Sequence, residues 1–199
     1  MKLVIASNNG NKVREIKEIL GGFFKEIYSL KELNVDIEVE ETGKTFRENA
    51  YLKAKAVSDI TKACVIADDS GLCVNALDGA PGLYSARYAG EEQNDAANKK
   101  LLLKNMADKT DRSAYFVTAI VLLYPDGKEI YAEGRTEGSI LYAEEGTRGF
   151  GYDALFFSKD LQKSFGLATS EEKNAVSHRG RALRELERKL IATNYNLHS

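Results

Sequence analysis

The chain has 199 residues, of which 43% are hydrophobic and 29% are charged, and its formal net charge is -2. This size and composition predict one domain, residues 1–199, with a substantial core. The charge balance excludes a basic surface for non-specific nucleic-acid binding, which needs clustered Lys and Arg. We therefore expect no nucleic-acid partner. No apolar run is long enough for a signal peptide or a membrane span, so we also expect no membrane partner, and the two cysteines below are typical of a cytoplasmic protein. Cys64 and Cys73 lack CxxC spacing and are expected to be free buried thiols.

The first third of the chain alternates strand-like and helix-like segments. In chain order they are a strand at 2–6, a polar turn at 7–12, a helix through Val13, Ile16 and Leu20, a weak strand at 26–29, an alternating apolar and acidic stretch at 35–43, a helix from Thr45 with an apolar stripe of Leu52, Ala56 and Ile60, and a strand from Cys64. Thr45 and Glu48 have capping-box spacing, in which each side chain satisfies a backbone donor at the helix start. This alternation predicts an α/β sheet with some parallel pairing.

The rest of the chain adds long strands and a helical end. In order, these segments are a Gly-rich loop at 77–92, a helix at 94–108, strands at 113–124 and 129–140, a glycine-rich segment at 146–157, a helix start with capping-box residues Thr169 and Glu172, and a last helix that starts near Ser177. The short "PDGK" turn between the two long strands predicts an antiparallel hairpin. We therefore expect a mixed sheet flanked by helices.

The strand that begins at Cys64 is expected to end in acidic residues. Its apolar run is followed directly by Asp68, Asp69 and Ser70. In open α/β sheets, ligands bind beyond the carboxyl ends of strands, and carboxylate oxygens at that place suit Mg²⁺ held together with substrate phosphates. Because Asp and Ser are also ordinary turn residues, a purely local turn is an equal alternative.

Three other segments carry groups that would suit a nucleotide. The turn at 7–12 precedes a helix N-terminus, which attracts anions, and Lys12 adds a full charge there. His178 and Arg179 fall in a first helical turn, where cations are disfavoured unless an anion compensates them. Phe150 lies beside glycines and suits stacking on a base. Taken singly, an asparagine-capped connection, surface decoration and a core aromatic are the simpler interpretations; together with the acids, these groups indicate a nucleotide site.

With all segments considered, the sequence resembles the inosine triphosphate pyrophosphatases of the Ham1/RdgB type. The matching segments occur in family order over nearly the whole chain and are "SNNGNK", "EETGKTFRENAYLKA", "ADDSGL", "DGAPGLYSARYAG", "GFGYDALFF" and "SHRGRAL". Many members carry Thr-Gly-Asn where this chain has Ser7, Asn8 and Asn9, and the serine keeps a hydroxyl there. The resemblance implies an elongated mixed α/β sheet with two lobes and a cleft between them (Ham1/Maf-like), and a homodimer.

The resemblance also implies an enzyme that hydrolyses dITP, ITP and XTP to the monophosphate and pyrophosphate with Mg²⁺. Asp69 matches the catalytic residue and metal ligand, and Glu40, preferred over Glu41, is the second metal ligand. The residues implied for substrate binding are Ser7, Asn8, Asn9, Gly10, Asn11, Lys12, Ser70, Phe150, Gly151, Tyr152, Asp153, Lys173, His178 and Arg179. Two alternatives remain open, namely a Maf-like pyrophosphatase for other modified nucleotides and a module that binds a nucleotide without hydrolysing it.

Overall fold

The structure is a computed structural model that describes residues 2–90 and 93–193. In chain order its main elements are β1 (Lys2–Ile5), α1 (Gly10–Leu20), β2 (Glu26–Ser29), α2 (Phe46–Thr61), β3 (Cys64–Val74), α3 (Asp95–Asn105), β4 (Ser113–Leu123), β5 (Glu129–Ile140), β6 (Phe156–Ser158), β7 (Lys163–Ser164), α4 (Ser170–Val176) and α5 (His178–Ala192). Most segments expected from periodicity are present within a few residues of their predicted bounds.

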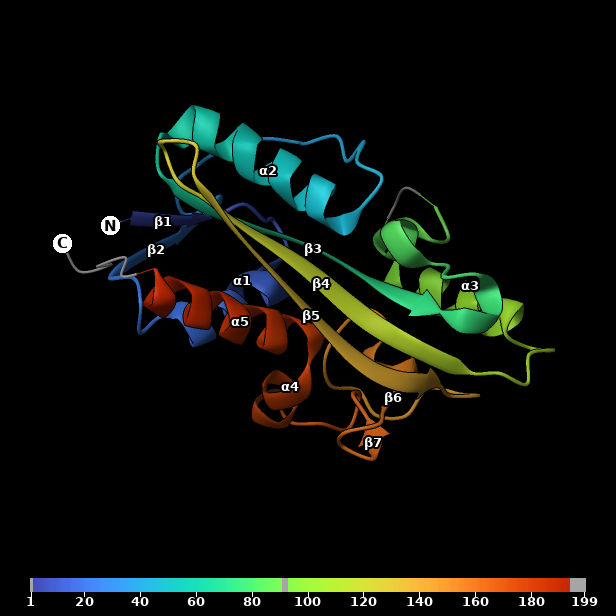
Figure 1. Ribbon diagram of the computed structural model, residues 1–199. Coiled ribbons are helices and arrows are strands. Elements are labelled where there is room, and N and C mark those ends of the chain that lie inside the picture. Colours follow the sequence, from blue (N-terminus) through green and yellow to red (C-terminus); the bar gives the residue numbers. More distant parts are fainter. Residues whose placement is uncertain (1, 91–92, 194–199) are drawn as a thin grey trace. The chain divides into compact units, whose positions relative to one another are not determined.

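The strands form one seven-stranded sheet in the order β2-β1-β3-β4-β5-β6-β7. β1 pairs in parallel with β2 and β3, whereas β6 pairs antiparallel with β5 and β7. β4 and β5 are neighbours joined by a tight turn, in which the Tyr124 N–H donates to the Lys128 carbonyl at 2.8 Å. The predicted mixed sheet flanked by helices is therefore confirmed (Figure 1).

The chain divides into two compact units. The first consists of Met1–Asp69, Thr118–Gly134 and Ala182–Ser199, and the second of Ser70–Val117 and Arg135–Arg181. β3, β4, β5 and α5 each continue from one unit into the other, and β3 does so between Asp69 and Ser70. The cleft implied by the resemblance stays a prediction.

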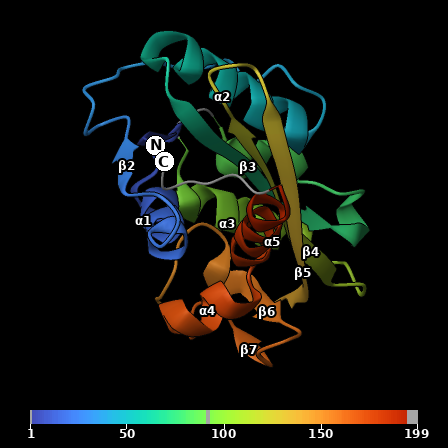
Figure 2. The ribbon, with the colours of Figure 1, turned by 60° about the vertical axis from the view of Figure 1, so that its left-hand side comes forward.

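The first unit packs helices on both faces of its strands, because successive strand side chains point to opposite faces. Figures 1 and 2 show α2 on one face and α1 with the unit's part of α5 on the other. On the α1 and α5 face, the buried side chains include Leu3, Ile5, Cys64, Ile66, Ile120, Leu183 and Leu186. On the α2 face, they include Val4, Val65, Ala67, Val121, Ala50 and Ala54. Odd and even positions of each strand thus serve different cores.

The second unit has an aromatic core. The ring of Phe116 lies 4.6 Å from that of Phe156 and stacks on that of Phe165 at 6.3 Å. Leu102 and Met106, at the C-terminal end of α3, pack into the same cluster. This core supports the first turn of α5, as described below.

The two predicted capping boxes form to different extents. Thr169 and Glu172 make both hydrogen bonds of the box at the start of α4. At the start of α2, the Thr45 hydroxyl accepts from the Glu48 N–H at 3.1 Å, but the Glu48 carboxylate accepts from the Lys44 N–H. In the box at the start of α2, the Glu48 side chain therefore bonds to the N–H one residue before the expected Thr45 N–H.

The two cysteines behave as expected for buried thiols. Both are free and buried, and burial raises the pKa of Cys64 to about 12. Neither thiol is therefore poised to react as a thiolate. Among the described residues, none of the helices combines the length and apolar character that crossing a membrane requires.

Glu32 links the end of β2 to α1. Its Oε2 accepts from the Ser29 N–H at 2.6 Å and from the Ser29 hydroxyl at 2.8 Å, and the Lys17 ammonium lies 2.8 Å from both carboxylate oxygens. The hydrogen bond from Lys17, followed by those from Ser29, lowers the pKa of Glu32 from 4.5 to about 2. Because the folded pKa lies below the unfolded one, this stabilisation is complete above the unfolded value and is lost as the pH falls towards the folded value.

We expect Glu32→Gln to reduce the free energy of unfolding at neutral pH and to lose this effect in acid. The difference from wild type should shrink from about pH 5 downwards and disappear near about pH 2, as measured by urea denaturation. Glu38→Gln, at an exposed carboxylate, is the control for the charge change itself. A difference that stayed constant throughout the acid range would contradict the linkage.

Candidate active site

β3 does not end at its acidic residues, and the expectation that it does is wrong. The strand runs from Cys64 to Val74 and carries Asp68, Asp69 and Ser70 in its middle. The residues beyond the acids are held as firmly as those before them, since Leu72 and Val74 are fully buried in the second unit's core. Neighbouring side chains of a strand point to opposite faces, so the two acids serve different faces of the sheet.

Asp69 faces α2, where it meets an amide, an ammonium and a second carboxylate. Its side chain is largely buried, and its Oδ2 accepts from Asn49 Nδ2 at 3.1 Å. The Lys53 ammonium lies 3.6 Å from Asp69 Oδ1 and 2.8 Å from Glu41 Oε1. One cation is therefore placed between the two carboxylates of Asp69 and Glu41.

The electrostatics of this cluster favour a basic Asp69 and a charged Lys53. Burial raises the pKa of Asp69, with Lys53 opposing the shift and Glu41 adding to it. For Lys53, burial alone would lower the pKa, but the charges of Asp69, Asp68 and Glu41 outweigh burial and raise it. Asp69 is consequently a stronger proton acceptor than an exposed aspartate.

Asp68 faces α1 and pairs with Lys12. Their charged groups lie 3.1 Å apart, and the Asp68 side chain is almost inaccessible to solvent. β1 ends at Ile5, which pairs with Ile66 of β3, so the connection from β1 to α1 leaves the sheet beside the acidic part of β3. The structure thus brings the predicted phosphate-binding segment to one of the two acids.

The connection at 7–12 is an asparagine-capped helix start, and α1 begins at Gly10, earlier than expected. Asn9 Oδ1 accepts from the N–H groups of Asn11 and Lys12 at 3.0 and 3.3 Å, and the Ser7 hydroxyl accepts from the Asn9 N–H at 3.1 Å. Gly10, Asn11 and Lys12 therefore occupy the first helical turn, while the Asn8 side chain is exposed. Four polar residues of the predicted segment are organised around the α1 N-terminus.

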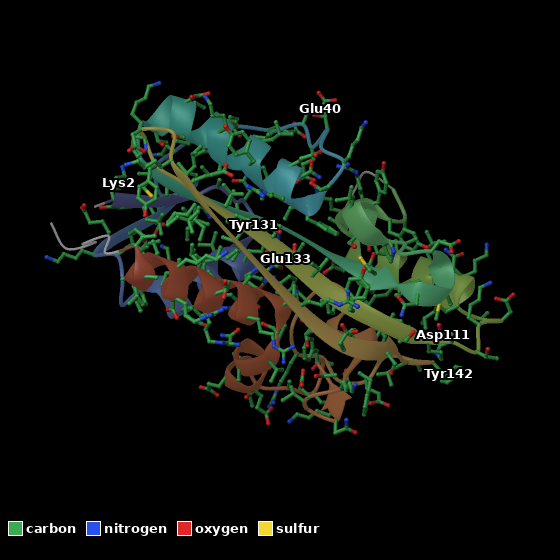
Figure 3. All side chains as sticks on the ribbon, viewed as in Figure 1. Lys2, Glu40, Asp111, Tyr131, Glu133 and Tyr142 are labelled. Atoms are coloured by element: carbon green, nitrogen blue, oxygen red, sulfur yellow. The ribbon has the colours of Figure 1, made fainter. Side chains whose placement is uncertain are left out.

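The structure places Glu41, rather than Glu40, beside Asp69. In the extended segment before α2, Val35 and Ile37 pack against the core under α2, and Glu41 shares their odd-numbered side. Figure 3 shows the Glu40 side chain pointing outward from this segment. The alternation at 35–39 was the signal that distinguishes the two acids, because continuing it by two residues reaches Glu41.

The first turn of α5 carries His178 and Arg179, as predicted. Both are buried, and the Arg179 guanidinium donates to the Ser70 hydroxyl at 3.1 Å. The His178 ring stacks on Phe116, with centroids 4.7 Å apart and planes 12° from parallel. A Cβ on Gly180 would lie 2.0 Å from the Asn174 carbonyl, so glycine allows the end of α4 to approach this turn.

Phe150, Asp153 and Lys173 form a second group in the same unit. Asp153 Oδ2 accepts from the Phe150 N–H at 2.9 Å and from the Lys173 ammonium at 2.7 Å. That ammonium also lies 4.5 Å from the centre of the Phe150 ring. Gly149 has φ +76° and a Cβ there would lie 2.1 Å from Asp153 Oδ2, so the bend depends on glycine.

The neighbouring predicted residues Gly151 and Tyr152 tie this segment to other parts of the second unit. The Gly151 N–H donates to Asp95 Oδ2 at 2.8 Å, and the Tyr152 hydroxyl donates to the Ser85 carbonyl at 2.7 Å. Tyr152 is buried, and Phe150 is half-buried. Hydrogen bonds to Asp95 and Ser85 therefore hold this bend in place, and the Phe150 side chain stays partly accessible to solvent.

Sequence reasoning missed Asn49 and Lys53 because it assigned the wrong face of α2. The expected stripe of Leu52, Ala56 and Ile60 is not the buried one, and Ile60 is 55% exposed. The face towards the sheet holds Asn49, Ala50, Ala54, Val57 and Ser58. The spacing of Asn49 and Lys53, four positions apart and next to the small residues Ala50 and Ala54, was the sequence pattern that could have indicated them.

Comparisons with known proteins agree over nearly the full length. The Ham1 family model matches residues 3–189. A dITP/XTP pyrophosphatase of Clostridium perfringens (strain 13 / Type A) is 50% identical over 194 residues, covering 94% of this chain and 95% of that protein. A dITP/XTP pyrophosphatase of Exiguobacterium sibiricum is 47% identical over 189 residues, covering 94% of this chain and 96% of that protein.

Solved structures show the same fold. The Staphylococcus aureus Ham1 protein has a TM-score of 0.87 at 42% identity, covering 98% of this chain and 100% of that one. A nucleoside-triphosphatase / dITP/XTP pyrophosphatase from Mycobacterium abscessus has a TM-score of 0.76 at 43% identity, covering 94% and 98%. With a family model spanning most of the chain and relatives this similar, the chain belongs to the Ham1 family.

Proposed function

We propose that the protein hydrolyses non-canonical purine nucleoside triphosphates, dITP, ITP, XTP and dXTP, to the monophosphate and pyrophosphate, and so removes them from the nucleotide pool. The observation that carries the proposal is the buried Asp69 carboxylate, which lies next to the Lys53 ammonium and opposite Glu41. Relatives that are 46–50% identical over more than nine-tenths of the chain carry the name dITP/XTP pyrophosphatase. Their name supplies the substrate class, and the cluster supplies groups suited to the chemistry.

We propose Mg²⁺ as the cofactor, with Asp69 and Glu41 as the carboxylates that would hold it. Across the described parts of the chain, no three or more His, Cys, Asp or Glu side chains gather as metal ligands. Mg²⁺ typically takes one or two carboxylates and completes its coordination with substrate phosphates. Asp69 and Glu41 offer two carboxylates, for which the ion would compete with the Lys53 ammonium. When bound, the ion would neutralise part of the triphosphate charge. Glu41 replaces Glu40, the ligand preferred from sequence.

In this proposal Asp69 orients the attacking water and accepts its proton. Burial raises the pKa of Asp69 in the metal-free protein, but a bound Mg²⁺ would lower it again, so Asp69 would act chiefly by holding the ion and aiming the water, with proton removal aided by the ion. Lys12 and Lys53 supply positive charge for the phosphates, and substrate charge would compete with Asp68 and Glu41 for them. Ser7, Asn8, Asn9, Gly10 and Asn11 would complete the phosphate-binding segment.

We assign recognition of the base to residues of the second unit, as the family resemblance implies. Hypoxanthine and xanthine carry a 6-oxo group where adenine carries an amine, so donors aimed at that oxygen would reject ATP. His178 and Arg179 are such donors, with His178 oriented by its stacking on Phe116. Phe150 offers a stacking surface, and Ser70, Gly151, Tyr152, Asp153 and Lys173 complete the proposed substrate-binding set.

A coupled phosphate assay tests the function directly. The protein is incubated with ITP, dITP, XTP, ATP, GTP or dUTP and Mg²⁺, with and without inorganic pyrophosphatase, and released phosphate is measured. We expect phosphate only with the coupling enzyme, and kcat/KM for ITP, dITP and XTP far above that for ATP and GTP. Binding without turnover would establish a non-hydrolysing module, and a preference for dUTP, or for methylated nucleotides added to the same panel, would establish the Maf-like alternative.

Three further proposals concern the form of the working protein. We propose that both units make one pyrophosphatase domain, residues 1–199, because three strands and α5 continue through both. We also propose a homodimer that acts in the cytoplasm on free nucleotides. Sedimentation of the purified protein tests the dimer, with a single monomeric species as the contrary result.

A further inference from the structure

Asn49 makes two hydrogen bonds that connect Asp69 to the segment carrying Glu41. Its Nδ2 donates to Asp69 Oδ2 at 3.1 Å, and its Oδ1 accepts from the Gly43 N–H at 2.8 Å. The residue is only 2% exposed, so bulk water hardly competes for either bond. A side-chain amide suits this place because it both donates and accepts without carrying charge.

The backbone at Gly43 is fitted closely to Asn49. A Cβ at position 43 would lie 2.5 Å from Asn49 Oδ1 and 2.7 Å from Glu48 Cβ, so a larger residue would push the two segments apart. Gly43 follows Glu41 by two residues, and the Gly43 bond therefore fixes the backbone close to that carboxylate. The hydrogen bond between Gly43 and Asn49 therefore sets the distance between α2 and the segment that carries Glu41.

Helix stability alone does not account for an asparagine at this position. Asparagine is a poor helix former, and a buried amide costs free energy unless its polar atoms are hydrogen-bonded. Nearby positions on the same face, Ala50 and Ala54, are small and apolar. The amide contributes through its two partners, one of which is the proposed catalytic carboxylate.

We propose that Asn49 is a positioning residue, which sets the orientation of the Asp69 carboxylate and its separation from Glu41; this inference rests on the function proposed above. Asn49 acts on the two carboxylates and not on the substrate. Its loss should therefore lower kcat and leave the KM for ITP nearly unchanged. Outer partners of catalytic and metal-binding groups commonly contribute about 10- to 100-fold, and we expect a decrease of that size.

Three variants separate positioning from packing. Asn49→Ala removes both bonds, whereas Asn49→Asp keeps the shape and the acceptor for Gly43 but replaces the donor to Asp69 with a second carboxylate that repels it. Val57→Ala is the matched control, because Val57 is 1% exposed on the same helix and packs in the core under α2. We expect both Asn49 variants to lose kcat, and Val57→Ala to lose stability while keeping kcat.

Amide hydrogen exchange at Gly43, followed by NMR, gives a readout that does not depend on catalysis. The amide should be protected in the wild type and in Asn49→Asp, and should exchange faster in Asn49→Ala. Unchanged exchange in Asn49→Ala, or a kcat loss in Val57→Ala equal to that in the Asn49 variants, would overturn the positioning role. If the wild type cleaved none of ITP, dITP and XTP while Gly43 exchange responded as expected, the proposed function would fail and the hydrogen-bond pair would stand.

Discussion

Asp69→Asn should reduce kcat for ITP by about 10²–10⁴-fold, the range typical of losing a positioned general base. The amide has the size of the carboxylate, so packing around it changes little, but it can neither accept a proton from water nor offer a charged ligand to Mg²⁺. KM should change much less, because the phosphate and base contacts proposed elsewhere remain. Steady-state kinetics at saturating Mg²⁺ measure both constants.

Asp59→Asn is the control for this experiment. This substitution also converts an aspartate to its amide. Asp59, however, lies exposed on α2 and pairs with Lys55 four residues earlier. Its kcat should equal that of the wild type. Near-normal turnover of Asp69→Asn at saturating Mg²⁺ would remove Asp69 from the catalytic role.

Glu41→Gln should raise the Mg²⁺ concentration required for half-maximal activity by about 10- to 100-fold, the size expected when the surroundings of a bound metal are damaged. The substitution also removes a 2.8 Å partner of the Lys53 ammonium, which would then be shared by fewer carboxylates. We expect kcat at saturating Mg²⁺ to fall by less than in Asp69→Asn. A Mg²⁺ titration at fixed ITP measures the effect.

Glu40→Gln provides the matched comparison, since it makes the identical change one residue earlier at an exposed carboxylate. Its Mg²⁺ requirement should stay at the wild-type value. The reverse pattern, with Glu40→Gln impaired and Glu41→Gln normal, would restore the preference drawn from sequence. Equal impairment of both variants would show that the local net charge matters more than either carboxylate.

The sequence predicted the sheet and the helices well because their periodicity is strong. It failed at β3, where Asp68, Asp69, Ser70 and Gly71 have the composition of a turn. The structure continues the strand through them, since β3 lies between β1 and β4 and has buried apolar residues on both sides of the acids. Strand propensity depends heavily on such context, which a local reading of the sequence does not contain.

In the candidate site, too, some residues could be predicted from the sequence and others could not. Sequence patterns and the family resemblance indicate Asp69, Lys12, His178 and Arg179. The structure places Asp69, Lys12 and Arg179 in buried or partly buried polar contacts and stacks the buried His178 ring on Phe116. Asn49 was missed because it lies 20 residues from Asp69, and only packing of α2 on the sheet brings the two together. A contact of that kind is tertiary information.

Because Asp68 and Asp69 lie on opposite faces of β3, the arrangement of the site depends on the number of residues that precede them in the strand. Inserting or deleting one residue between Cys64 and Asp68 would exchange the faces of every later side chain. Asp69 would then point to the α1 face and Asp68 to the α2 face, with the composition of the strand almost unchanged. A point substitution at an apolar position of β3 leaves both acids on their own faces, whereas a single-residue change in length between Cys64 and Asp69 does not, so this spacing matters for the function.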